Sequence, residues 1–207
     1  MTSARCLGRP GALLAIISGP SGVGKDTIID VLRERHPDRA RHFVVTCTTR
    51  ERRPYEVDGQ SYHFLGAEAF AALRDHGALL EASEVHGNWY GTPRDQVVDA
   101  LAAGRDAILK IDVQGARAIR QLVPDALLIF LVPPSLDELH ERLAARRTES
   151  PAEFRRRYED AAVELARQED YDHVVVNATG DAAGTAERIH TILQQEHERH
   201  PDRRVAV

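Results

Sequence analysis

Apolar residues recur along the chain in short runs that are typical of buried strands. These runs cover residues 13–18, 42–46, 106–111, 126–132 and 173–177. Between several of them the apolar positions follow the helical period, over residues 25–35, 92–103, 114–122, 136–145 and 151–168. Strands that alternate with helices are joined by crossover connections, which make the sheet parallel and cover both of its faces. The pattern therefore predicts an α/β fold.

Two segments interrupt the alternation. Residues 47–91 are polar and contain glycines, aromatic residues and short alternating runs, which predict a small mixed β insertion. Residues 146–157 concentrate arginines between two predicted helices, and Pro151 is a typical first residue of the second one. The last residues, 197–207, are polar and are expected to fray.

Composition narrows the class of protein. The chain has 207 residues, of which 43% are hydrophobic and 29% charged, as in a soluble globular domain. Its net charge of −5 argues against a broad basic surface, so we expect no nucleic-acid partner. No apolar run approaches the roughly 20 residues that span a bilayer, so we expect no membrane partner. Cys6 and Cys47 are too few for a disulfide framework, which indicates a cytoplasmic location.

The first strand runs into a glycine-rich segment that resembles a P-loop, G-x-x-x-x-G-K-[ST]. Gly19, Gly24 and Lys25 match the motif, and Asp26 stands where a hydroxyl is usual. A strand, a glycine turn and a helix place backbone N–H groups around one anion. The alternative is a glycine-rich turn that only happens to contain lysine. The candidate phosphate-binding residues are Gly19, Pro20, Ser21, Gly22, Val23, Gly24, Lys25, Asp26 and Thr27.

Asp26 is the unusual residue of this loop. Its carboxylate is a hard oxygen ligand that suits Mg²⁺, and it is our candidate metal ligand, but it also adds negative charge beside phosphates. Lys110 lies inside a predicted strand whose carboxyl end borders the loop, so we expect it to pair with Asp26. The alternative is that Lys110 caps the sheet without touching Asp26.

The insertion carries a second set of candidate ligands. Arg50, Arg53 and Tyr62 offer donors that suit a phosphate monoester. Glu81, in a small pocket, would accept two hydrogen bonds from a base edge with adjacent N–H groups, as guanine presents.

Five segments together resemble the guanylate kinase family, over residues 13–193. They are GPSGVGK, TTRERRPYEVDGQSYHF, LLEASEVHGNWYGT, ILKIDVQGARAIR and RLAARRTES. The resemblance implies transfer of the γ-phosphoryl group of ATP to GMP, with Mg²⁺, by a monomer or small homo-oligomer. It also implies a P-loop NTPase-type core of residues 1–46 and 92–207, a helical lid at about residues 142–157, and a GMP-binding insertion at residues 47–91.

The resemblance also implies roles for single residues. Ligands of the GMP phosphate would be Arg50, Arg53, Tyr62 and Tyr90, and guanine contacts would come from Thr46, Glu81, Thr92 and Asp112. The lid arginines Arg142, Arg146 and Arg157 would join Lys25 and Arg50 at the transferring phosphates, and Asn177 would lie near the adenine. The alternatives are that Tyr62 only packs, that Arg157 belongs to a solvated run, and that Asn177 only ends a strand.

Three residues depart from the family pattern. Asp26 replaces a serine, Lys110 stands where an acidic residue is usual, and Tyr55 replaces a small residue. The Gly-Lys-Asp-Thr sequence resembles ribose 1,5-bisphosphate phosphokinase, which is the alternative enzyme. A third alternative is a guanylate kinase-like binding module without catalytic activity.

Overall fold

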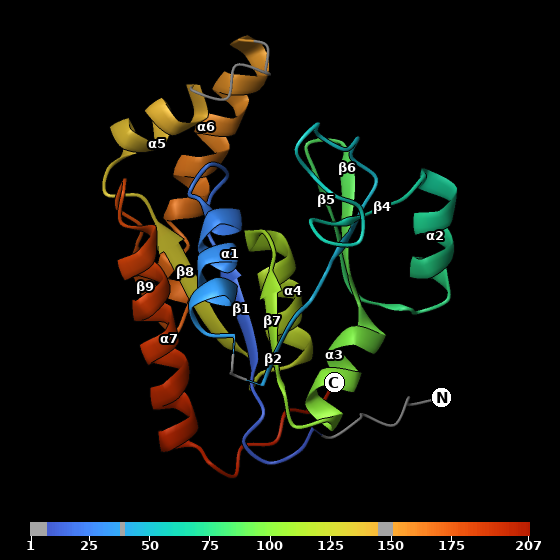
Figure 1. Ribbon diagram of the computed structural model, residues 1–207. Helices are drawn as coiled ribbons and strands as arrows, with labels where there is room; N and C mark the ends of the chain where they lie inside the picture. Colours follow the sequence, from blue (N-terminus) through green and yellow to red (C-terminus); the bar gives the residue numbers. More distant parts are fainter. Residues whose placement is uncertain (1–7, 38–39, 145–150) are drawn as a thin grey trace.

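The computed structural model describes residues 8–37, 40–144 and 151–207, with side chains from residue 155 onward in the last range. A five-stranded parallel sheet in the order β2-β7-β1-β8-β9 forms its centre (Figure 1). The strands are β1 (Leu14–Ser18), β2 (Arg41–Phe43), β7 (Asp106–Lys110), β8 (Leu127–Val132) and β9 (His173–Val176). The predicted α/β fold with a parallel sheet is confirmed, and each strand lies within a predicted run except for the first residue of β2.

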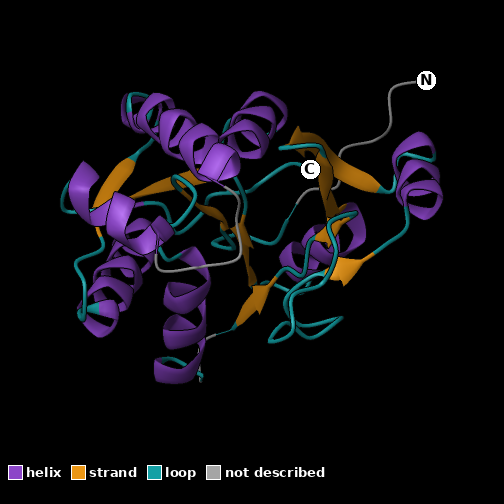
Figure 2. Cartoon of the chain, turned by 90° about the horizontal axis from the view of Figure 1, so that it is seen from above, coloured by secondary structure: helices purple, strands orange, loops and turns teal. Residues whose placement is uncertain are grey.

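Helices cover both faces of this sheet (Figures 1 and 2). The helices α3 (Arg94–Ala102) and α4 (Val113–Leu122) cover one face, and α1 (Lys25–Arg35) and α7 (Ala182–Arg199) cover the other. The helices α5 (Leu136–Ala144) and α6 (Pro151–Leu165) pack against each other above the sheet in Figure 1, and a short 3-10 turn follows at Gln168–Asp170. Successive residues of β1 face opposite sides, as the pleat requires. Leu14 and Ile16 pack with α3 and α4, whereas Ala15 and Ile17 pack with α1 and α7. The two hydrophobic clusters therefore fix the end of β1 from both faces.

The insertion forms a separate small sheet in the order β4-β3-β6-β5. Its elements are β3 (Cys47–Thr48), β4 (His63–Phe64), α2 (Ala67–Asp75), β5 (Leu79–Val85) and β6 (Asn88–Pro93). One strand pair is parallel and two are antiparallel, which confirms the mixed β insertion. Its small core forms around Phe70 and Leu79, and Figure 1 shows it beside the main sheet.

Two expectations were wrong. The helix predicted over residues 92–103 begins at Arg94, because Thr92 and Pro93 continue β6 and pair with β5. The C-terminal residues do not fray, because Val205 and Val207 are buried in the main core. Backbone hydrogen bonds also join Gly8 N–H to the Val205 carbonyl (2.9 Å) and Gly11 N–H to the Arg203 carbonyl (2.9 Å).

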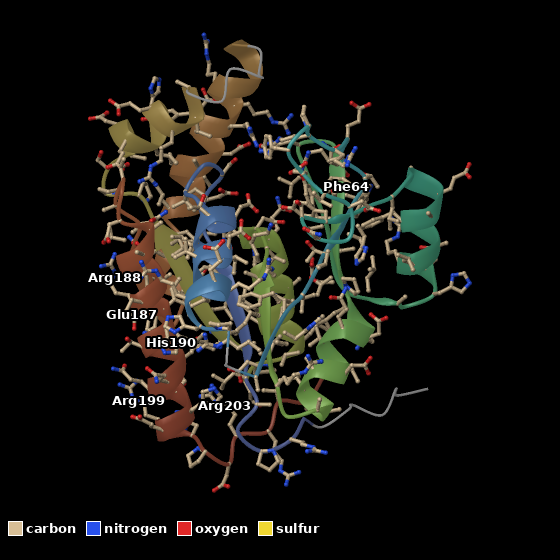
Figure 3. All side chains as sticks on the ribbon, in the orientation of Figure 1. Phe64, Glu187, Arg188, His190, Arg199 and Arg203 are labelled. Atoms are coloured by element: carbon tan, nitrogen blue, oxygen red, sulfur yellow. The ribbon has the colours of Figure 1, made fainter. Side chains whose placement is uncertain are left out.

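Side-chain contacts tie the C-terminal segment to α7. Arg203 Nη2 donates to Glu196 Oε2 at 2.9 Å, and within the helix Arg199 Nη1 donates to the other oxygen of Glu196 at 3.4 Å. Figure 3 shows Arg199 and Arg203 at the lower end of the helix. The same view labels Glu187 and His190 higher on α7, where the helix meets α1.

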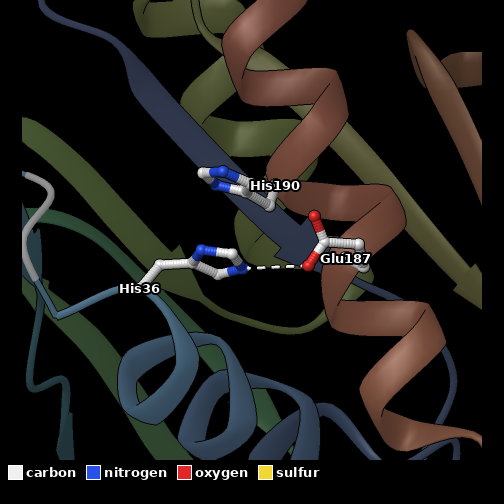
Figure 4. A group of neighbouring side chains, drawn as sticks. All are labelled: His36, Glu187 and His190. Carbon is white, nitrogen blue, oxygen red and sulfur yellow. Dashed lines mark ion pairs between the residues drawn. The ribbon is translucent and has the colours of Figure 1, made fainter.

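A cluster of His36, Glu187 and His190 joins α1 to α7 (Figure 4). The two imidazole rings stack with centroids 3.6 Å apart, and His36 Nε2 lies 3.2 Å from Glu187 Oε2. Their candidate metal-ligand atoms lie within 4.8 Å of one another. However, the rings lie face to face rather than converging on one point, and Arg41 Nη2 donates to His190 Nδ1 at 2.8 Å. A guanidinium here opposes a cation, so we interpret the cluster as a helix-joining contact.

None of the helices in the described ranges is long and apolar enough to cross a membrane.

The buried tail leads to a stability prediction. Val205→Ala should lower the free energy of unfolding by about 1–3 kcal/mol, because it removes two methyl groups from a site with no solvent exposure. Val163→Ala is the matched control, since Val163 is 64% exposed on α6 and its truncation should change stability by less than about 0.5 kcal/mol. Urea denaturation measures both; equal effects would contradict the observed packing of the tail.

Candidate active site

The loop between β1 and α1 has the geometry of a phosphate cradle. Gly19 and Gly24 adopt φ of 144° and 98°, and a Cβ on Gly19 would lie 2.4 Å from the Leu131 carbonyl oxygen. Only glycine fits such a position without displacing the neighbouring strand. Lys25 Nζ folds back over the loop and donates to the carbonyls of Gly19 (2.5 Å) and Pro20 (3.1 Å). The loop is therefore closed around its lysine.

One pocket joins this loop to the insertion and to α6. Most of the predicted site residues line it, namely Gly19, Ser21, Gly22, Gly24, Lys25, Asp26, Thr46, Arg50, Arg53, Tyr62, Glu81, Tyr90, Asp112 and Arg157. Thr92 lies directly behind Glu81 and is fully buried. Of the remaining loop residues, Val23 is buried and Thr27 is exposed on α1. The structure thus brings both predicted groups of phosphate ligands to one cavity.

Glu56 holds the two insertion arginines together. Arg50 Nη2 donates to Glu56 Oε1 at 2.7 Å, and the Arg53 backbone N–H donates to Glu56 Oε2 at 2.8 Å. Burial raises the pKa of Glu56, but Arg50 and Arg53 outweigh it and leave the pKa below its ordinary value. The carboxylate is therefore charged at neutral pH and fixes both arginines before any ligand binds.

Tyr62 lies between cationic side chains. The Arg50 guanidinium carbon is 5.6 Å from the Tyr62 ring centroid, and Lys110 Nζ is 4.5 Å from the same centroid. The Tyr90 and Tyr62 rings meet edge to face, with their centroids 6.0 Å apart. Tyr55 is 74% exposed, and its hydroxyl accepts a hydrogen bond from Arg53 Nη1 at 3.3 Å.

Glu81 presents an unused acceptor inside the pocket. Its Oε1 accepts a hydrogen bond from Thr92 Oγ1 at 2.7 Å. Its Oε2 is buried and has no hydrogen-bond partner in the part of the chain that the structure describes. Burial raises the pKa of Glu81 to about 7, although the Thr92 hydroxyl acts in the opposite direction. A ligand that donates N–H groups here would satisfy this oxygen and favour the charged form.

Asp112 faces the same part of the pocket and begins α4. Its Oδ1 accepts from the backbone N–H groups of Gln114 (2.7 Å) and Gly115 (3.0 Å), which is an N-cap. Ser83 Oγ donates to its other oxygen at 3.2 Å. The strand–helix junction after β7 therefore positions Asp112 opposite β5.

The predicted pairing of Asp26 with Lys110 is confirmed. Lys110 Nζ makes a short hydrogen bond to Asp26 Oδ1, and the alternative in which the two side chains do not touch is wrong. The contact follows from topology, because Lys110 ends β7 in register with Ile17 of β1, next to the loop. Burial lowers the pKa of Lys110, but Tyr62 and Asp26 outweigh it and raise the pKa above its ordinary value.

Two predicted residues lie behind the loop rather than in the pocket. Arg142 Nη1 donates to the Val23 carbonyl at 3.2 Å, and its Nη2 contacts Glu138 Oε1 at 2.5 Å. Asn177 Nδ2 donates to the same Val23 carbonyl at 2.7 Å. In this conformation both side chains hydrogen-bond to the Val23 carbonyl of the loop and do not line the pocket. Arg146 lies outside the described residues.

Two titratable residues of the pocket were not predicted from the sequence. Glu164 of α6 lines the pocket beside Lys25, and burial raises the pKa of its carboxyl, which Lys25 partly offsets. Seven residues separate it from Arg157, so the shared helix face was a usable signal. His86 stands at the tip of the β5–β6 hairpin with a φ of 52°, and its Nδ1 lies 3.5 Å from Asp160 Oδ2 of α6. Its sequence context gave no signal of this position.

A strand–loop–helix phosphate cradle that shares a pocket with an arginine-bearing insertion defines a P-loop phosphotransferase. The guanylate kinase family model matches residues 12–196. A guanylate kinase of Mycobacterium sp. (strain MCS) is 47% identical over 185 residues, covering 88% of this chain and 90% of the relative. The crystal structure of guanylate kinase from Anaplasma phagocytophilum has a TM-score of 0.75 at 32% identity, covering 91% and 88% of the two chains. The chain belongs to the guanylate kinase family.

The raised pKa of Glu81 predicts a pH dependence of stability. The folded protein holds the Glu81 proton up to a pKa of about 7, whereas the unfolded chain loses it near 4.5. The folded state binds more protons in this interval, so the contribution of Glu81 to stability falls as pH rises through it. Relative to Glu81→Gln, the wild type should lose up to about 3 kcal/mol of unfolding free energy between pH 4.5 and pH 8.

Urea denaturation at several pH values measures this difference. Glu84→Gln, an exposed position on the same strand, is the control and should follow the wild type. A constant difference between wild type and Glu81→Gln across the interval would contradict a buried, partly unpaired carboxyl.

Proposed function

We propose that the protein transfers the γ-phosphoryl group of ATP to GMP and forms ADP and GDP. The observation that carries the proposal is the position of Glu81, which lines the same pocket as Lys25, Arg50 and Arg53 and has one buried oxygen without a hydrogen-bond partner in the described residues. Within one cavity Glu81 would accept hydrogen bonds from a guanine base, the two arginines would bind its monophosphate, and the loop with Lys25 would bind the triphosphate of ATP. Membership of the guanylate kinase family supports the same reaction.

Catalysis in this site needs alignment and charge neutralisation rather than a protein base. The second pKa of a phosphate monoester is about 6, so the acceptor oxygen is already anionic near neutral pH. Lys25 would contact the outer ATP phosphates, and Arg50 with Arg53 would aim the acceptor phosphate. Burial lowers the pKa of Lys25, although Glu164 and Asp26 oppose this effect. Phosphate oxygens would favour its charged form further.

The lid residues supply charge from a third side. Arg157 lines the pocket from α6, and we propose that it spreads the charge of the transferring group. Arg142 and Arg146 have the same proposed role, which for Arg142 requires movement away from the Val23 carbonyl. Lid closure would exclude water and thereby favour transfer over hydrolysis. We propose that Asn177, which donates to the Val23 carbonyl of the loop, lies near the adenine of bound ATP.

Mg²⁺ is the cofactor that fits this site. The Asp26 side chain is 64% exposed and lies in the pocket beside Lys25, and carboxylate oxygens are preferred Mg²⁺ ligands. We propose Asp26 as the residue that holds the ion with ATP. Bound there, Mg²⁺ would neutralise charge on the phosphates that Lys25 contacts.

Guanine selection would come from Glu81, Thr92, Thr46 and Asp112. An adenine in the same place would leave the buried Glu81 oxygen without its two donors, and such sites reject the wrong ligand by as much as roughly 10⁴-fold. A sugar bisphosphate has no use for this acceptor, which disfavours the ribose 1,5-bisphosphate phosphokinase alternative. The intact cradle and Lys25 disfavour a binding module without activity. We further propose a cytoplasmic enzyme that is a monomer or a small homo-oligomer.

An ADP-release assay with alternative acceptors tests the function. GMP, dGMP, AMP and ribose 1,5-bisphosphate are each offered with Mg²⁺ and ATP, and we expect robust turnover with GMP and at least about 100-fold lower kcat/KM with AMP. Turnover with the sugar bisphosphate alone, or no turnover by folded protein, would overturn the proposal. In Glu81→Gln the ratio of kcat/KM for GMP over AMP should fall at least about 10-fold, and in the exposed control Glu84→Gln it should stay unchanged.

A further inference from the structure

We propose that Lys110 binds the phosphate of the acceptor nucleotide, and that Asp26 holds its ammonium group in the free protein. The inference rests on the proposed function, because it assigns a ligand within the same pocket. Lys110 lines that pocket, where its ammonium group contacts Asp26.

Amino-acid usage singles out this residue. The chain has 27 basic residues, and its only two lysines are Lys25 and Lys110. Both line the same pocket. An ammonium is a compact point charge, whereas a guanidinium is a wide planar fork, so the two are not equivalent in a narrow site. Every other basic residue that this count includes is arginine. Lysine at these two positions of the pocket therefore indicates that the smaller cationic group is needed there.

Lys110 lies between the residues expected to bind the ATP phosphates and those expected to bind the acceptor phosphate. Its Nζ contacts Asp26, which follows Lys25 in the first turn of α1, on the ATP side. The same Nζ is 4.5 Å from the Tyr62 ring centroid, and Arg50 approaches that ring at 5.6 Å from the acceptor side. Lys110 is therefore the cation of the central sheet that reaches the proposed GMP-phosphate ligands.

Burial decides which partner moves when a phosphate enters. The Lys110 side chain is 15% exposed, whereas the Asp26 side chain is 64% exposed. Asp26 can exchange its ion pair for water, because most of its carboxylate side chain is already in contact with solvent. Lys110 cannot reach water as easily and needs an anion where it lies. A phosphate with two charges and three acceptor oxygens is a stronger partner than one carboxylate.

The alternative is a structural role in which Lys110 only orients Tyr62. That role would act through Tyr62, itself a proposed ligand of the GMP phosphate, so guanosine alone does not separate the two cases. Measuring Lys110→Met in a Tyr62→Phe background does separate them: a direct phosphate ligand still loses GMP binding there, whereas no further loss would overturn the inference. A second alternative is that Asp26 only repels the phosphate. In that case Asp26→Asn would tighten GMP binding equally with and without Lys110, which a double-mutant cycle measures.

The first experiment measures GMP and guanosine binding by calorimetry in EDTA, without ATP. Lys110→Met should weaken GMP binding about 10- to 100-fold, the loss expected for a hydrogen bond between charged groups, and leave guanosine binding unchanged. Lys110→Arg should lose less. Asp26→Asn should tighten GMP binding in the wild-type background and tighten it less in Lys110→Met. Equal losses for GMP and guanosine, unchanged GMP binding, or an equal effect of Asp26→Asn in both backgrounds would overturn the inference.

The second experiment measures the unmutated protein, and a variant is needed only to assign the signals. Labelling lysine with ¹³C at Cε gives two side-chain signals, and Lys110→Arg assigns them. GMP should shift the Lys110 signal, and guanosine should not. A GMP-induced shift confined to Lys25 would overturn the inference and leave the proposed function standing. Wild-type protein that binds no GMP would overturn the proposed function together with it.

Discussion

Mutual repulsion among cations in one small pocket is the constraint on which the rest of the structure depends. Two phosphate-bearing substrates can approach each other only where positive charge surrounds both. Lys25, Lys110, Arg50, Arg53 and Arg157 line a single cavity, and no fold would hold them so close without counter-charge. Glu56 binds the two insertion arginines, and Asp26 binds Lys110. Glu164 supplies a further carboxylate beside Lys25.

These carboxylates differ in how they can respond to a ligand. Glu56 is 7% exposed and keeps its arginines in place, so it acts as a fixed support. The Asp26 side chain lines the pocket, is 64% exposed and can turn toward solvent. The free protein therefore holds the two insertion arginines in fixed positions and leaves the ion pair of Lys110 exchangeable. Such an arrangement limits the reorganisation required when substrates bind.

Much of this could be predicted from the sequence, because the signals are local. The strands of the central sheet are continuous apolar runs, and the glycine loop directly follows one of them. The Asp26–Lys110 contact was predictable because parallel strands place their carboxyl ends together. Prediction failed where tertiary contacts override local pattern. Val205 and Val207 stand in a polar tail and are buried only because the segment at Gly8 and Gly11 pairs with it.

The misplaced start of α3 has a similar cause. Pro93 is a good helix-start residue, but β6 continues through it to pair with β5. Glu56 stands in a motif that was recognised for its arginines, and its bridging role depends on how the loop folds. Arg142 and Asn177 show that a motif identifies residues near the loop without fixing the side from which they contact it.

The most direct test of the central claim is the titration of GMP bound to the protein, followed by ³¹P NMR in EDTA. The phosphate of free GMP has its second pKa at about 6. Surrounded by the cations of the pocket, the bound phosphate should titrate at least about one unit lower. A bound phosphate that titrates at or above the value of free GMP would contradict a pocket in which these side chains converge on the acceptor.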